Sequence, residues 1–192
     1  HGKGYAVRYG FAHAEGDVIG FMDAGGDLSA KALLPMLAQF AFQDADAVIG
    51  SKRHPDSKVE YPTYRRILSW GYQRVIHLLF GINVRDSQVG MKLYKRQLLE
   101  DVLPRLLVKQ FAFDIEILAV ANRLGYTKIY EAPIELNFAV ATSSITVKKI
   151  LVTVWNMMQD TLAVFYRLRI RHYYDNSNKR KWRYDPELNF RV

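Results

Sequence analysis

The stretch GDVIGFMDAGGDLSA, residues 16–30, is the most informative part of this chain for its fold class. The apolar run 18–22 is typical of a strand buried in a parallel sheet, and a turn that contains two glycines follows it. Asp23 stands where the strand ends, and Asp27 stands four residues later. Ligands of open α/β sheets bind just beyond the carboxyl ends of strands, so the pattern predicts a ligand site at this turn.

The two carboxylates allow two interpretations. Oxygen ligands at a strand end suit a hard cation such as Mg²⁺ or Mn²⁺ that carries substrate phosphates. Alternatively, Asp27 or Ser29 caps the helix that follows. The stretch alone does not choose between a metal site and a helix cap.

Apolar spacing and turn residues divide the rest of the chain into alternating helices and strands. We expect helices at residues 6–14, 30–42, 64–80, 96–103, 111–124 and 145–168, and strands at 18–23, 45–50, 91–94 and 128–138. A polar loop occupies 51–62, and Pro133 confines the last strand to an edge or a bulge. This alternation predicts an α/β sheet with helices on both faces.

Composition limits the class of protein. The 192 residues, 49% of them hydrophobic, suffice for one domain with an appendage. The chain has no cysteine, which excludes disulfides and thiolate metal sites. Its net charge of +8 implies an anionic partner, which could be nucleic acid, a phospholipid surface or a phosphorylated substrate.

The positive charge is concentrated near the C-terminus. Residues 145–192 contain ten Lys or Arg and four Asp or Glu, a net +6 of the chain's +8. No run there reaches the roughly 18 apolar residues of a membrane-spanning helix. An amphipathic helix of this kind can lie on a bilayer, with Trp155, Phe165 and Tyr166 near the headgroups. The alternative is a packing helix or a dimer contact followed by a solvated tail.

Several short motifs occur along the chain in a definite order. They are Gly-Lys-Gly at 2–4, Asp-x-x-x-Asp at 23–27, Gly-Ser-Lys-Arg at 50–53, Arg-x-x-x-Ser at 65–69, Asp-x-x-x-Gly-Met-Lys at 86–92 and Phe-Asp-Ile-Glu at 113–116. The ordered set resembles family 2 glycosyltransferases with the GT-A fold. It is most similar to the polyprenyl-phosphate hexose synthases, the group that contains dolichyl-phosphate mannose synthase and dolichyl-phosphate glucosyltransferase. The resemblance covers residues 2–138.

Two departures from the family pattern affect what the resemblance implies. The family's first half, which holds most of the nucleotide-base pocket, has no counterpart here, so we expect a piece of a longer, N-terminally truncated protein. Gly25 stands where the family has a second Asp. Asp23 and Asp27 would then share the cation with water or donor phosphate; the alternative is weakened metal binding.

The implied architecture is a GT-A-like (Rossmann-like), mostly parallel sheet flanked by helices over residues 1–140, lacking its N-terminal half. An amphipathic helix and a basic, aromatic tail follow at 141–192. A sheet that lacks strands on one side exposes an apolar edge, which can lead to a homodimer or to aggregation. The resemblance places the protein at the cytoplasmic face of a membrane, as a peripheral protein bound to an anionic lipid surface.

The implied reaction is inverting, metal-dependent transfer of a hexose from a nucleotide-diphosphate sugar to a polyprenyl phosphate. The acceptor phosphate is already ionised near neutral pH, so a strong general base is dispensable and cations must hold it. By resemblance, the roles are metal binding for Asp23 and Asp27; acceptor-phosphate binding for Ser51, Lys52, Arg53, Arg65 and Ser69; donor binding for Lys3, Arg8, Gln88 and Lys92; and catalysis for Asp86 and Asp114.

Ordinary structural roles compete with these assignments. Residues 52–54 also suit a solvated basic loop, and the segment 86–92 suits an Asp turn with a hairpin glycine. Asp114 and Glu116 suit the first turn of any helix. They lie two residues apart and point to different helix faces, so we expect one to reach the site and the other to serve the structure.

Two other functions deserve comparison with an enzyme. A non-catalytic membrane-surface or interaction module would keep the fold without the metal chemistry, and Gly25 favours it. A nucleic-acid binder is suggested only by the charge. The chain has no recognisable nucleic-acid-binding motif, and its acidic pairs would repel phosphate without a metal. We therefore expect no nucleic-acid partner.

Overall fold

The computed structural model describes residues 2–59, 63–110, 112–136, 147–181, 184–185 and 190–191; side chains at 63–65, 147–151, 153 and beyond 178 lie outside this description. The chain forms two compact units. The first comprises His1–Gly16, Gln97–Gly125 and Ser144–Val192, and the second comprises Asp17–Arg96 and Tyr126–Ser143.

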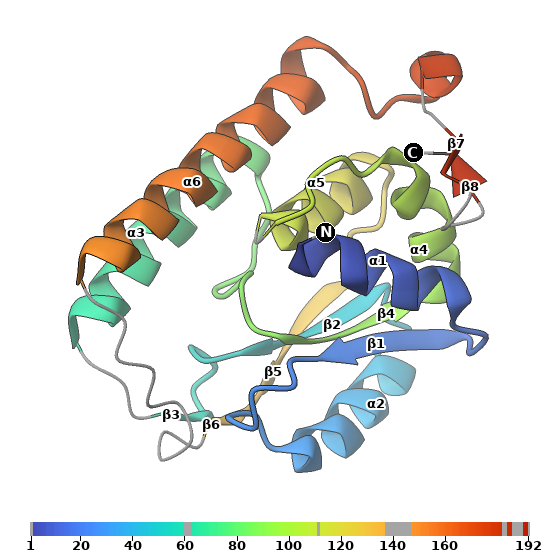
Figure 1. The fold of residues 1–192 in the computed structure, drawn as a ribbon. Coiled ribbons are helices and arrows are strands. Elements are labelled where there is room, and N and C mark those ends of the chain that lie inside the picture. The colour runs from blue at the N-terminus through green and yellow to red at the C-terminus, as the bar shows by residue number, and fades with distance from the viewer. Residues whose placement is uncertain are drawn as a thin grey trace. The chain divides into compact units, whose positions relative to one another are not determined.

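A four-stranded sheet forms the centre of the second unit (Figure 1). Its strands are β1 (Val18–Met22), β4 (Met91–Lys95), β2 (Ala47–Ser51) and β5 (Ile129–Pro133), in that spatial order. β4 is antiparallel to both β1 and β2, whereas β2 and β5 are parallel. The expected mostly parallel sheet is therefore corrected to a mixed one: three strands share a direction, but two of the three pairs are antiparallel. The reason is that the chain returns to the edge where β2 ends before it enters β4.

The edge position of β5 explains how a proline fits into this sheet. Pro133 is the last residue of β5 and lies opposite Ser51 of β2. A proline has no backbone N–H, so it is tolerated at the edge but not in a central strand. The expected edge strand is confirmed, although the extended run breaks at Ile134 into β5 and the short β6 (Glu135–Leu136).

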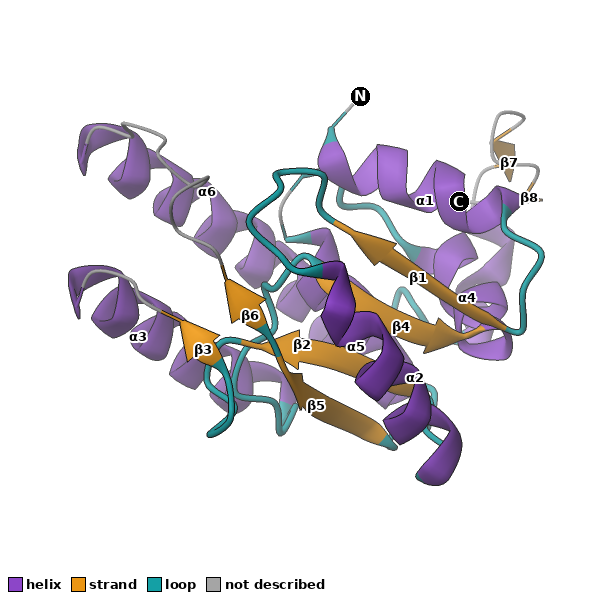
Figure 2. Ribbon diagram, turned by 90° about the horizontal axis from the view of Figure 1, so that it is seen from below, coloured by secondary structure: helices purple, strands orange, loops and turns teal. Residues whose placement is uncertain are grey.

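One helix covers a face of the sheet within this unit (Figure 2). After a short 3₁₀ helix at Ala30–Ala32, α2 (Leu33–Phe42) buries Met36 and Phe40 in a cluster with core residues of β2 and β4. Burial of such a side chain stabilises a fold by about 1.5–3 kcal/mol. α2 carries no charged residue, and Phe42 remains exposed.

Short elements connect the sheet to the second long helix of this unit. β3 (Lys58–Val59) lies inside the expected loop 51–62 and pairs in parallel with β6. α3 (Thr63–Phe80) follows and ends at Gly81, whose φ of +69° suits glycine at a helix C-terminus. The expected helix at 64–80 and its glycine stop are confirmed.

The first unit is mostly helical. Its elements are α1 (Lys3–His13), α4 (Arg96–Val102, starting at the unit boundary), a 3₁₀ turn at Leu103–Arg105, α5 (Phe113–Arg123), α6 (Val147–Phe165) with a π-helical extension at Tyr166–Ile170, a 3₁₀ helix at Asn176–Lys181, and the paired strands β7 (Tyr184–Asp185) and β8 (Phe190–Arg191). Every residue from Phe113 to Ala121 is buried, so α5 is the core helix of this unit. None of the described helices is both long and apolar enough to cross a membrane.

A buried carboxylate fastens the segment after α6 to α5. Glu116 accepts hydrogen bonds from the amides of Leu107 (3.0 Å) and Val108 (2.8 Å) and from the hydroxyl of Tyr174 (2.7 Å), and Arg167 lies 3.5 Å away. Burial raises the pKa of Glu116, and these four partners partly offset the shift. Glu116 therefore serves the structure of the first unit.

Removing the Tyr174 hydroxyl should destabilise the first unit in a pH-dependent way. The buried carboxylate loses one donor in Tyr174→Phe, so we expect the free energy of unfolding to fall by about 1–3 kcal/mol at neutral pH. Because its pKa is higher in the folded state, Glu116 stabilises the fold at pH values below its ordinary pKa of 4.5 and loses this contribution as the pH rises through the folded-state pKa. Loss of the Tyr174 hydroxyl raises the folded-state pKa further. The loss of unfolding free energy in Tyr174→Phe should therefore become smaller as the pH is lowered toward 4.5.

Chemical denaturation at neutral pH and near pH 4.5 measures this difference, with Tyr166→Phe as the matched control. Tyr166 is 47% exposed, so loss of its hydroxyl should leave stability unchanged. Equal losses in the two variants, or a Tyr174→Phe deficit that grows on acidification, would contradict the role given to Glu116.

Candidate functional site

Residues distant in sequence meet at one edge of the sheet in the second unit. Because β4 runs opposite to β1 and β2, its first residues lie where those two strands end. Met22 is paired with Met91, and the amide of the next residue, Asp23, donates to the carbonyl of Gly90 at 2.7 Å. Ser51 ends β2 at the same edge. The edge therefore carries the candidate metal ligand Asp23 and the start of the basic loop.

The absence of a side chain at Gly90 allows Asp23 to take its position. A Cβ atom built at Gly90 would overlap the Asp23 carboxylate. Any residue other than glycine would thus displace the carboxylate or the backbone. Gly90 was expected either as part of a family motif or as a hairpin glycine, and the structure gives it a steric reason.

The far end of the carboxylate turn is held by β6. Leu28 forms an isolated bridge with Leu136, and the amide of Ser29 donates to the carbonyl of Glu135 at 3.3 Å. The Ser29 hydroxyl accepts from the amide of Lys31 at 3.4 Å and caps the short helix. Ser29 is therefore the residue that caps this helix. Asp27 is not needed as the cap, so its interpretation as a metal ligand stays open.

A basic cavity lies against the loop that follows β2. It has a volume of about 430 Å³ and is lined by Lys52, Arg53, His54, Pro55, Ser57, Val59, Arg66 and Trp70. Ser57 shapes the loop: its hydroxyl donates to the carbonyl of Ser51 at 2.6 Å and accepts from the amide of Ile134 at 2.9 Å. Cations and one indole line the same hollow, a combination that suits a phosphate with an apolar neighbour.

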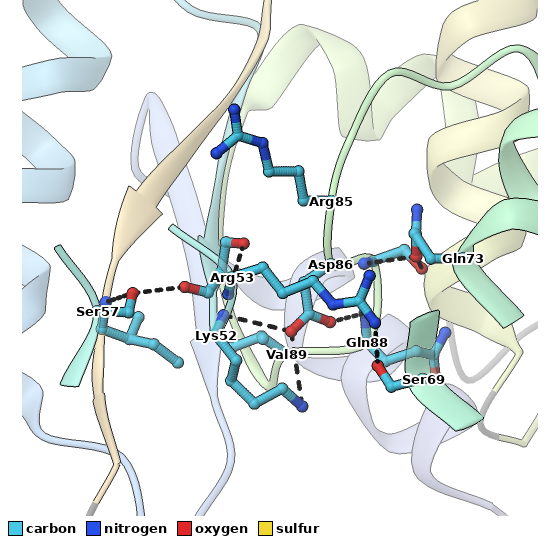
Figure 3. A network of polar contacts seen from close by, with 12 residues as sticks. Lys52, Arg53, Ser57, Ser69, Gln73, Arg85, Asp86, Gln88 and Val89 are labelled. Carbon is cyan, nitrogen blue, oxygen red and sulfur yellow. Dashed lines mark hydrogen bonds and ion pairs between the residues drawn. The ribbon is translucent and has the colours of Figure 1, made fainter. Parts of the chain in front are cut away.

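Several predicted acceptor-binding residues converge here. The Arg53 guanidinium donates to the Ser69 hydroxyl at 3.1 Å, and its amide donates to the Ser51 hydroxyl at 3.3 Å (Figure 3). Ser51, Lys52, Arg53 and Ser69 are thus brought together, while the side chain of Arg65 lies outside the described residues.

Asp86 is hydrogen-bonded and almost fully buried, with 3% of its surface exposed. One carboxylate oxygen accepts from the amide of Lys52 at 3.3 Å and lies 3.6 Å from its ammonium, and the other accepts from the amide of Gln88 at 3.2 Å (Figure 3). The carboxylate therefore fastens the basic loop to the segment that precedes β4.

The two predicted donor-binding residues near β4 differ in their surroundings. The side-chain nitrogen of Gln88 is buried and has no hydrogen-bond partner among the described residues. Lys92 is fully buried: its ammonium donates to the carbonyl of Val89 and lies 5.3 Å from the centre of the Phe21 ring. Gln88 thus has a donor to offer a ligand, whereas Lys92 is engaged by its own neighbours.

The remaining candidates, Lys3, Arg8 and Asp114, belong to the first unit. Lys3 starts α1, and Arg8 and Asp114 are buried. Gly4, beside Lys3, packs against the segment before α5: its amide donates to the carbonyl of Lys109 at 3.0 Å, and a Cβ there would lie 2.8 Å from that of Phe113.

Sequence reasoning missed part of the cavity lining. The residues it did not select are His54, Pro55, Ser57, Val59, Arg66 and Trp70. Arg66 and Trp70 stand one position after the selected Arg65 and Ser69 and have the same four-residue spacing, which is the signal that could have found them. Val59 could not be found, because β3 was not predicted.

The donor set at Asp23 and Asp27 fits a hard cation only with help from a ligand. In the part of the chain that the structure describes, no group of three or more His, Asp or Glu side chains could hold a metal ion. Two carboxylates suit Mg²⁺ or Mn²⁺ when water and phosphate oxygens complete the coordination.

Comparison with known protein families matches residues 1–103 to glycosyl transferase family 2. The chain belongs to this family. It is 30% identical over 139 residues to a dolichyl-phosphate beta-glucosyltransferase of Trichomonas vaginalis, covering 71% of this chain and 43% of that protein. It is 34% identical over 120 residues to an undecaprenyl-phosphate mannosyltransferase of Micrococcus luteus, covering 62% and 48%. The chain thus spans about half the length of the curated relatives it matches.

A solved structure supports the same fold. Glucosyl-3-phosphoglycerate synthase of Mycobacterium tuberculosis, solved with Mn²⁺, UDP-glucose and phosphoglyceric acid, aligns with a TM-score of 0.60 at 17% identity, covering 86% of this chain and 55% of that one. The likeness at this identity concerns the fold. It supports the expected GT-A-like α/β architecture, although the sheet is mixed rather than mostly parallel.

The contact between Gly90 and Asp23 predicts the effect of adding one methyl group. Gly90→Ala should displace the Asp23 carboxylate and weaken Mn²⁺ binding by roughly 10- to 100-fold, the usual loss when the group that orients a ligand is removed. Electron paramagnetic resonance titration of Mn²⁺ measures the affinity.

Gly71→Ala on α3 is the matched control, since among the described residues no heavy atom outside the neighbouring helix backbone lies within 4 Å of the added methyl. Its affinity should equal that of the parent. Unchanged binding in Gly90→Ala, or no Mn²⁺ binding by the parent, would contradict the predicted cation site at Asp23.

Proposed function

We propose that this chain forms part of an enzyme that transfers a hexose, with inversion, from a nucleotide-diphosphate sugar to a polyprenyl phosphate in a metal-dependent reaction. The observation that carries the proposal is the basic cavity at the sheet edge that also holds Asp23. Family membership supports the reaction class, and two of the matched relatives are named for transfer to dolichyl phosphate and undecaprenyl phosphate.

The cavity has the chemistry of an acceptor-phosphate site. Lys52, Arg53 and Arg66 supply positive charge, and the planar guanidinium groups can pair with two phosphate oxygens at once. Trp70 and Val59 offer apolar surface to the first isoprene unit of the lipid. Because the phosphate is already an anion, these residues have to hold and orient it rather than deprotonate it.

The donor diphosphate is assigned to the carboxylate turn. Asp23 and Asp27 would hold Mg²⁺ or Mn²⁺, which supplies positive charge to the departing nucleoside diphosphate when bound. Gln88 would donate its unpartnered amide N–H to a donor oxygen, since an unsatisfied buried donor costs about 1–3 kcal/mol. Lys3, Arg8, Lys92 and the catalytic roles of Asp86 and Asp114 remain predictions from the family pattern.

We assign α6 to contact with an anionic membrane, which would place the protein as a peripheral component on the cytoplasmic face. Val152, Trp155 and Leu162 are each at least half exposed and share one face of the helix. Arg169 and Arg171 near its end are exposed cations. An apolar helix face with adjacent cations suits a surface of anionic lipid. A homodimer remains a prediction from the sheet edge.

A transfer assay tests the proposed reaction. Labelled UDP-glucose or GDP-mannose is incubated with protein, Mn²⁺ and polyprenyl phosphate, and the labelled lipid is counted. We expect Arg53→Gln to lower kcat/KM for the acceptor by roughly 10- to 150-fold, the loss of about 1.5–3 kcal/mol for a hydrogen bond to a charged group.

Arg85→Gln is the control for that assay, because the Arg85 side chain is 62% exposed and does not line the cavity. It should retain the parent's kcat/KM. Absence of labelled lipid with either donor, or equal losses in the two variants, would argue for a non-catalytic module instead.

Vesicle co-sedimentation tests the membrane assignment separately. The double variant Trp155→Ser, Leu162→Ser removes two exposed apolar side chains and should reduce binding to phosphatidylserine vesicles at moderate salt. Gln159→Ser, which changes an exposed polar residue of the same helix, should bind like the parent. Equal binding of all three proteins would count against α6 as the contact surface.

A further inference from the structure

We propose that Gln73 is a positioning residue that couples occupation of the basic cavity by the acceptor phosphate to the placement of Asp86. The inference rests on the proposed function, because the acceptor phosphate is the ligand that it invokes. It adds a residue of α3 that no family motif selected.

The segment 84–88 has no helix or strand, yet side chains bind its backbone (Figure 3). The carbonyl oxygen of Gln73 accepts from the amide of Ser87 at 3.3 Å and from its hydroxyl at 2.9 Å, and the Gln73 amide nitrogen donates to the carbonyl of Val84 at 2.7 Å. One side chain thus holds this segment on both sides of Asp86.

A second side chain holds the same segment from the sheet. One carboxylate oxygen of Glu131 on β5 accepts from the amides of Arg85 (2.8 Å) and Asp86 (3.1 Å). Because Glu131 lies on a regular strand, its hydrogen bonds attach the segment 84–88 to the sheet. Gln73 gives it a link to α3, the helix that lines the cavity.

The contacts form a closed ring that includes two residues of the cavity lining, Lys52 and Arg53. Arg53 binds Ser69 on α3, and Gln73 lies four residues further along the same helix face. Gln73 binds Ser87, next to Asp86, and Asp86 binds Lys52, the neighbour of Arg53. A phosphate bound by Lys52 and Arg53 therefore acts on both ends of a chain of contacts that passes through Gln73 and Asp86.

The chemistry of glutamine matches this position. Gln73 is 8% exposed and uses its amide both to accept from Ser87 and to donate to Val84. Methionine has a similar shape but offers neither bond. Glutamate provides both bonds only when protonated, since its ionised form has no donor for the Val84 carbonyl. The two substitutions therefore separate the hydrogen bonds from the packing.

The test uses farnesyl phosphate as the probe and the full chain as the protein. Calorimetry measures its affinity, and hydrogen exchange measures how far it slows the amides of residues 86–88. In the parent, farnesyl phosphate should bind and slow these amides. Gln73→Met should still bind, because Arg53 and Ser69 are untouched, but the slowing should be lost. In the transfer assay, its kcat should fall by roughly 10- to 100-fold with little change in acceptor KM, as for a small misplacement of reacting groups.

Gln73→Glu supplies the readout that a packing role would not change. In Gln73→Glu, farnesyl phosphate should again slow the exchange of amides 86–88 as the pH falls and the carboxyl is protonated, and kcat relative to the parent should recover over the same pH range. Gln73→Met should show neither recovery. Gln43→Met, at the residue that caps the C-terminus of α2, is the control for replacing a partly buried glutamine and should match the parent.

The outcomes separate this inference from the proposed function. Binding in Gln73→Met with slowing equal to the parent's, or no pH-dependent recovery in Gln73→Glu, overturns the coupling and leaves the acceptor site intact. No binding of farnesyl phosphate by the parent overturns the acceptor site and the coupling with it. If Gln73→Met does not fold, the pH series of Gln73→Glu decides alone.

Discussion

The direction of β4 is the constraint on which the candidate site depends. Inserted between β1 and β2 and antiparallel to both, β4 starts at the edge where those strands end. Three segments far apart in sequence, the turn after Met22, the loop after Ser51 and the segment before Met91, thereby share one edge. The segments pack most tightly where Asp23 contacts Gly90, because the Asp23 carboxylate leaves no room for a side chain at position 90.

Buried charge in the second unit is used to hold loops. Asp86 binds Lys52 and the amide of Gln88, and Lys92 binds the carbonyl of Val89. Burying such groups is costly unless they are hydrogen-bonded, so their partners fix the geometry of the loops. Among the described residues of this edge, the cavity lining and the unpartnered side-chain amide of Gln88 remain to meet a ligand, beside the candidate metal ligands Asp23 and Asp27. Glu116 in the first unit serves structure by the same physical rule.

The sequence predicted the location of most elements but not their direction. Apolar runs and glycine stops identified β1, β2, β4 and the α-helices, because burial and helix termination leave local signals. Apolar periodicity carries no information on strand direction, so β4 was not recognised as antiparallel. β3 and β6 are two residues each, too short for any pattern. The ordered motifs selected Ser51, Arg53 and Ser69, which the structure brings together, whereas Trp70, which has the same helical spacing from Arg66, was not selected.

Paramagnetic broadening by Mn²⁺ in the ¹⁵N-labelled chain with UDP tests the shared edge most directly. We predict loss of amide signals at residues 24–27, 52–53 and 88–90, three separate segments broadened by one ion. Signals of Asp44, Lys95 and Lys128, which are joined by ion pairs at the opposite end of the strands, should stay sharp. Broadening centred on Asp44, or no broadening at residues 88–90, would contradict a cation site at this edge.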